Sequence, residues 1–212
     1  MNAPRLAPLL LLLLPLAALA QDDQGLDPRF LALREGATPV GGLGSFLERY
    51  VGECGEPGLA GSCEEKAKAF RKAHEGKRLF LLVGEDAAGM LSPGAFDPDT
   101  GELRVNVTPF FPAGNYALSH GAPRRTDARG NPVMALLRAE GQAPDDWMPG
   151  TFQRLFQMRG VRAQVIFTPT GVWSLPRRGG GKSRGVSARV EALLVTVART
   201  GEPLALWLAR GR

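Results

Sequence analysis

The chain has 212 residues, of which 44% are hydrophobic and 22% are charged. This balance is typical of a soluble globular protein, and it excludes a disordered, a collagen-like or a membrane-spanning chain. Glycine and proline supply 27 and 17 residues, so many turns are expected.

Residues 1–20 have the organisation of a secretory signal peptide. Arg5 supplies a positive charge, an apolar stretch runs from Leu6 to Leu19, and Ala18-Leu19-Ala20 places small residues before the expected cleavage site. No later segment reaches the roughly 18 apolar residues that a membrane span needs. We therefore expect cleavage after Ala20 and an exported mature chain without a transmembrane span, either periplasmic or extracellular. The alternative is an uncleaved N-terminal anchor.

Two cysteines, Cys54 and Cys63, are separated by eight residues. In an exported protein an even number of cysteines predicts a disulfide, and closing so short a loop contributes about 2.5–3 kcal/mol in the chain-entropy model. The alternative of a redox pair lacks the C-x-x-C spacing. A metal site is not expected, because the only histidines, His74 and His120, fall on different predicted elements.

The first part of the mature chain, residues 21–76, is predicted to be helical. Asp27-Pro28 places an N-cap residue before a proline at the first helical position, and Gly36 ends that helix. Ser45-x-x-Glu48 and Ser62-x-x-Glu65 are capping boxes. They predict helices that begin at Ser45 and at Ser62.

From residue 77 the hydrophobic period changes to about two, which indicates strands. Residues 133–140 fit a helix or a strand, and we favour a strand; a short helix is expected near 151–159. Two related turns, at 99–102 and 199–202, predict hairpins. Residues 103–107, 161–167 and 186–192 alternate, so each should have one core face, and Val190 and Ala192 should share that face. Residues 78–83 are predicted to be a buried strand, and residues 204–208 a strand paired with the segment that ends at Val197.

These elements predict one α+β domain over residues 21–212. The strands follow one another without intervening long helices, which argues against a doubly wound α/β fold. We expect N-terminal helices packed on a mostly antiparallel β-sheet or open sandwich, with residues 77–212 mainly β.

The segment from Arg177 to Arg184 superficially resembles a phosphate loop. Pro176 occupies the position of the required first glycine, and a strand pattern follows the segment, so we expect no nucleotide. Residues 147–190 contain eight basic and no acidic residues, whereas residues 21–65 carry a net charge of −6. Such asymmetry favours an anion-binding patch, or it is neutralised inside the fold. The candidate anion-binding residues are Arg177, Arg178, Lys182 and Arg184.

His120 is the candidate catalytic residue. It would need an orienting carboxylate such as Asp97, Asp99 or Asp127, and no G-x-S-x-G nucleophile motif is present. We therefore favour an exported, non-enzymatic envelope protein that binds a partner or an anionic envelope component. The alternative is an envelope hydrolase that uses His120 with a nearby carboxylate. The sequence implies no cofactor and no metal.

Four stretches carry a resemblance to a known family: residues 41–46, 108–123, 172–182 and 199–207. With these segments the chain resembles an uncharacterised family of small exported proteins from high-GC soil bacteria of the myxobacterial type. The resemblance implies export and a single domain. It implies no activity, cofactor or site residue.

Overall fold

The computed structural model describes residues 25–52, 60–84, 91–97, 102–107, 110–123, 134–138, 154–155, 157–177 and 179–209. Several predictions fall on residues outside these ranges. They are the signal peptide with its cleavage after Ala20, and the residues Cys54, Asp99, Asp127 and Arg178.

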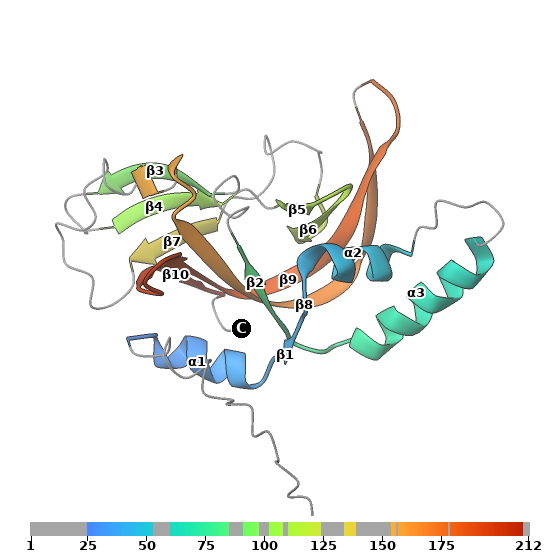
Figure 1. Cartoon of the computed structure of the whole chain (residues 1–212), viewed down its shortest axis with the longest axis horizontal. Coiled ribbons are helices and arrows are strands. Elements are labelled where there is room, and N and C mark those ends of the chain that lie inside the picture. Colours follow the sequence, from blue (N-terminus) through green and yellow to red (C-terminus); the bar gives the residue numbers. More distant parts are fainter. Residues whose placement is uncertain are drawn as a thin grey trace, which may run out of the picture.

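Helices dominate the N-terminal part of the described chain and strands the remainder (Figure 1). The helices are α1 (Pro28–Glu35), α2 (Leu43–Val51) and α3 (Ala60–His74). The strands are β1 (Thr38–Pro39), β2 (Leu79–Val83), β3 (Leu91–Asp97), β4 (Glu102–Val107), β5 (Phe110–Ala113), β6 (Tyr116–His120), β7 (Met134–Arg138), β8 (Val161–Pro176), β9 (Lys182–Val197) and β10 (Pro203–Leu208).

These strands form one sheet in the order β1-β2-β8-β9-β10-β7-β4-β3, to which the β5–β6 hairpin is joined through β6. The β1–β2 and β6–β9 pairs are parallel, and the other pairs are antiparallel. The predicted α+β class, with N-terminal helices on a mostly antiparallel sheet, is confirmed. The ambiguous segment 133–140 contains the strand β7, as favoured. Near 151–159, the described residues 154–155 and 157 are helical.

The predicted start of the first helix is correct, but the two capping boxes do not form. Asp27 caps α1, and its side chain accepts a hydrogen bond from the backbone N–H of Arg29 at 2.7 Å. In α2, by contrast, Ser45 lies inside the first turn and its Oγ donates to the carbonyl of Gly42 at 3.2 Å. The earlier start brings Leu43 onto the helix face that packs against the core. α3 likewise begins before Ser62, at Ala60.

Each face of the sheet carries its own hydrophobic core. The main core lies on the face covered by α2, and its fully buried side chains include Leu47, Leu81 and Phe167. The second core lies on the face covered by α1, where Phe30 packs with Ile166 of β8. Burial on both faces explains why the central strands are apolar over much of their length.

A β-bulge divides β9 at Glu191. Phe167 of β8 lies opposite Val190, while Ile166 lies opposite Ala192, so Glu191 is an extra residue in the ladder. The extra residue reverses the alternation: Val190 faces the main core and Ala192 the second core. The prediction that Val190 and Ala192 share one face is therefore wrong, because the regular pattern holds only up to the bulge.

The carboxylate of Glu191 binds three side chains at this bulge. Its Oε2 accepts from Arg78 Nε at 2.8 Å, and its Oε1 accepts from Thr168 Oγ1 at 2.7 Å and from Arg189 Nη2 at 3.3 Å. Burial alone would raise the pKa of Glu191, but the hydrogen bonds from Thr168 and Arg78, with the charge of Arg78, hold the pKa below its usual value. The ionised carboxylate thus ties β2, β8 and β9 together.

We expect Glu191→Gln to lower the free energy of unfolding at pH 7 by about 1–2 kcal/mol, the scale of a partly exposed charge-assisted network. Because the folded state lowers the pKa of Glu191, the carboxylate contributes stability above the ordinary glutamate pKa of about 4.3 and loses it as the pH falls through the folded pKa. Urea unfolding of both proteins at neutral and acidic pH measures this. Glu202→Gln, at an exposed position, is the control; an equal loss at both pH values would contradict the prediction.

Candidate functional site

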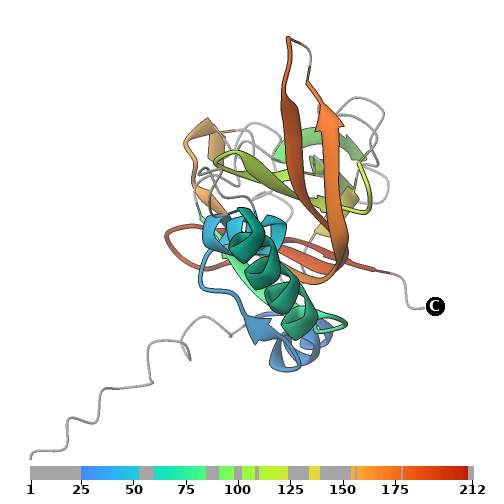
Figure 2. The ribbon, with the colours of Figure 1, turned by 90° about the vertical axis from the view of Figure 1, so that its right-hand side faces the viewer.

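The outer halves of β8 and β9 form a projecting hairpin, here called the arm, from Gly171 to Ser187. Its strands are paired from Gly171 with Ser187 to Pro176 with Lys182. Figures 1 and 2 show the arm rising from the sheet. One extra residue lies in each strand beside its base, Thr170 on β8 and Glu191 on β9. Because each bulge bends its strand, the two extra residues account for the change of direction.

A tight glycine turn closes the tip of the arm. Arg177 N–H donates to the carbonyl of Gly181 at 3.1 Å, and Gly180 N–H donates to the carbonyl of Arg177 at 3.3 Å. Gly179, Gly180 and Gly181 have φ values of 92°, 101° and 78°, a region that favours glycine over any other residue. All three are exposed, so the turn faces solvent.

The base of the arm is held by β6, which pairs in parallel with β9 from Arg184 to Ala188. Gly185 lies at this junction, with the ring of Trp173 above it. A Cβ at Gly185 would lie 2.7 Å from Cε2 of Trp173 and would also meet the carbonyl oxygen of Ala117. Only glycine therefore allows β6 and the indole to approach β9 this closely.

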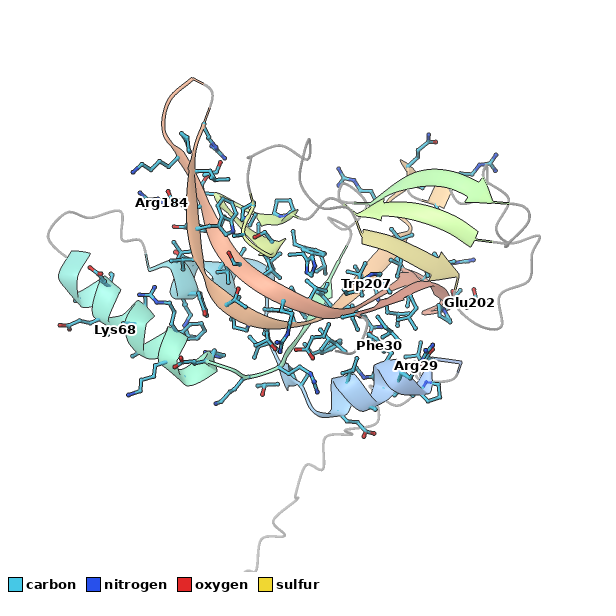
Figure 3. The ribbon with its side chains drawn as sticks, turned by 180° about the vertical axis from the view of Figure 1, so that it is seen from behind. Arg29, Phe30, Lys68, Arg184, Glu202 and Trp207 are labelled. Carbon is cyan, nitrogen blue, oxygen red and sulfur yellow. The ribbon has the colours of Figure 1, made fainter. Side chains whose placement is uncertain are left out.

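Three of the four predicted anion-binding residues are described, and all belong to the arm. Arg177 and Lys182 are exposed, and Arg184 is half-buried (Figure 3). Arg177 Nε donates to Ser183 Oγ at 2.6 Å, which fixes its guanidinium beside the turn. The structure thus gathers these bases at one end of the molecule.

Ion pairs are seen at α1 and at the Glu191 bulge. Asp27 binds Arg29 of its own helix, with the closest nitrogen and oxygen 2.6 Å apart. Glu191 forms ion pairs with Arg78 and Arg189 near the base of the arm. The arm contributes no acid of its own, because residues 147–190 contain none.

His120 is bound to the backbone at the end of β6. Its Nδ1 accepts from the N–H of Val190 at 3.2 Å, and its ring packs edge-on against Trp207, with centroids 5.8 Å apart. Burial lowers the pKa of His120, which favours the neutral ring that this acceptor role requires. The imidazole extends the β6–β9 ladder by one further hydrogen bond.

The neighbouring hydroxyl is also bound to the backbone. Ser119 is fully buried, and its Oγ donates to the carbonyl of Gly121 at 2.8 Å, with the carbonyl of Val186 at 3.3 Å. Of the carboxylates proposed for His120, only Asp97 lies in a described strand, at the end of β3. Within the described residues, no group of three or more His, Cys, Asp or Glu side chains could hold a metal ion.

Only one of the two cysteines in the predicted disulfide lies among the described residues. Cys63 lies on α3 and carries no free thiol, whereas Cys54 is outside the described residues. The Cys54–Cys63 bond stays a prediction.

Sequence reasoning missed Glu191 and Gly185, two residues that place the arm. A signal for Glu191 exists, because the odd positions are polar at Arg189 and Glu191 but apolar at Leu193 and Val195. Such a change of phase within one strand indicates a bulge. Gly185 has no local signal, since its neighbours come from β6 and β8.

We expect Gly185→Ala to destabilise the protein by about 1–3 kcal/mol, the usual cost of overpacking, because Trp173 or β6 must move. Gly171→Ala is the matched control: it lies in the same arm, and nothing is within 4 Å of its added Cβ. Thermal or urea unfolding of the two variants measures the difference. Equal stability of the two variants would contradict the close packing at Gly185.

Comparison with known proteins places the chain in a family. Among the described residues, no helix has the length and apolar character needed to cross a membrane. Neither a curated protein nor a solved structure matches the chain. A family model does match, over residues 2–212. The chain therefore belongs to the family described as a family of unknown function (DUF6066).

Proposed function

We propose that this chain is an exported, non-enzymatic protein of the cell envelope that uses the arm to bind an anionic component. The observation that carries the proposal is the exposed glycine turn with Arg177 and Lys182 beside it. A projecting turn flanked by bases presents positive charge away from the body of the protein, where a large anion can reach it. Arg178 belongs to the same segment of sequence.

Two sets of contacts hold the arm in this position. The network at Glu191 secures the bend, and the β6–β9 pairing with Gly185 under Trp173 secures the base. A binding element needs such support, because affinity falls when its side chains must be ordered at each encounter.

A hydrolase receives no comparable support. His120 Nδ1 and Ser119 Oγ are both engaged with backbone groups. A nucleophile and its base would need to bind each other and reach a substrate. We therefore propose binding without catalysis.

We expect the protein to be retained on heparin at low ionic strength and released as salt increases, because ions screen and replace such contacts. Replacing Arg177, Arg178, Lys182 and Arg184 by Ser should abolish retention and leave thermal unfolding nearly unchanged. The matched control replaces the four exposed lysines of α3 and its C-terminal extension by Ser, removing the same charge. These are Lys66, Lys68, Lys72 and Lys77.

The two variants separate local from general electrostatics. Retention that is absent in the wild type, or lost equally in both variants, would contradict the arm as the binding element.

Export and the disulfide can be tested together on protein recovered from the envelope or the medium. We expect an intact mass that begins at Gln21 and no thiol that reacts under denaturing, non-reducing conditions. Replacing Cys54 and Cys63 by Ser should lower stability by about 2–3 kcal/mol. A retained Met1 would contradict export by cleavage, and two reactive thiols would contradict the bond.

A further inference from the structure

We infer that the arm meets its ligand end-on and that this ligand is the anionic headgroup surface of a lipid bilayer. The inference rests on the proposed function and specifies its partner. The competing ligand is a linear polyanion, such as an acidic polysaccharide, lying along one face of the arm.

The first argument is the position of the tip. In Figures 1 and 2 the turn between β8 and β9 lies at the end of a hairpin that extends well beyond the helices and the β5–β6 hairpin. A flat surface can therefore reach the tip without meeting α1, α2 or α3. A small ligand would not need a support of this length, but an extended surface does.

The second argument is the distribution of charge around the arm. Lys182 and Arg184 are two residues apart on one strand, so they share a face and are spaced by about 6.8 Å along it. Ser183 lies between them on the opposite face, and it holds Arg177 through the 2.6 Å bond. The bases therefore occupy both faces near the tip. A polymer lying along one face would leave the other set unused, whereas a plane in front of the tip meets both.

The third argument is the chemistry of the tip itself. Gly179, Gly180 and Gly181 have no side chains, and nothing lies within 4 Å of a Cβ built on any of them, so the backbone can approach headgroups closely. Val172, a large hydrophobic residue of the arm with 50% exposure, lies behind the bases. It is five residues before Arg177, about 17 Å along an extended strand. Contact is therefore with headgroups and does not require insertion into the hydrocarbon.

The test is sedimentation of the full chain with vesicles of phosphatidylcholine, with and without phosphatidylglycerol, at low and high salt. We expect binding only to vesicles that contain phosphatidylglycerol and only at low salt. Arg177→Ser and Lys182→Ser should each weaken partitioning about fivefold, the scale for one base at an anionic membrane, and their effects should multiply. Thermal unfolding checks that each variant is folded.

Two matched variants give this test its specificity. Lys68→Ser removes one exposed charge from α3 and should leave partitioning unchanged. Val172→Ser removes a large exposed hydrophobic side chain of the arm and should also leave partitioning unchanged. A loss in Val172→Ser as large as that in Lys182→Ser would overturn the headgroup mode. If only one of Arg177→Ser and Lys182→Ser has an effect, contact through both faces is wrong.

Heparin distinguishes this inference from the proposed function on which it rests. Salt-sensitive retention on heparin without binding to phosphatidylglycerol vesicles would overturn the bilayer and leave the arm as a site for a linear polyanion. Failure on both heparin and vesicles would overturn the proposed function as well.

Discussion

The arrangement of this molecule depends on one half-buried carboxylate. Glu191 occurs where β9 gains an extra residue, and its oxygens bind Arg78 of the segment leading into β2 together with Thr168 of β8. A bulge leaves backbone groups and an additional side chain at a place where the ladder is interrupted. Here the additional side chain is charged, and β9 changes its partner at this point. Before the bulge, residues 184–188 of β9 pair with β6, and after it residues 192–196 pair with β10. The backbone carbonyl of Glu191 also accepts from the N–H of Ala209, 2.8 Å away, just after β10.

Local chemistry was sufficient for some parts of this fold. Asp27 and Pro28 define the start of α1, and alternation indicates part of β8 and the part of β9 before the bulge, because these signals act within a few residues. The capping box at Ser45 was misleading because packing of Leu43 against the main core extends α2 toward its N-terminus. A capping hydrogen bond contributes about 1 kcal/mol, which burial of a leucine can exceed.

The candidate site was predictable to a similar degree. Glycines flanked by bases between two strands indicate an exposed turn, and the three glycines of the arm are exposed. The faces on which Lys182 and Arg177 lie depend on the register of β8 against β9. The role of His120 depends on a donor 70 residues away, at Val190. Adjacent serine and histidine residues suggest catalysis, but the sequence of these two residues does not predict their hydrogen bonds to β9 across the sheet.

The parallel β6–β9 pair has a consequence for the order in which the chain can fold. Tyr116 aligns with Arg184, and Leu79 of β2 aligns with Phe167, so the centre of the sheet joins segments far apart along the chain. Closing such loops is entropically costly and slows folding. α2 and β2 cannot bury their apolar faces until β8 and β9 have been synthesised, because those strands provide the surface of the main core. A nascent chain of this topology therefore lacks the surface of its main core until residues 161–197 have been synthesised.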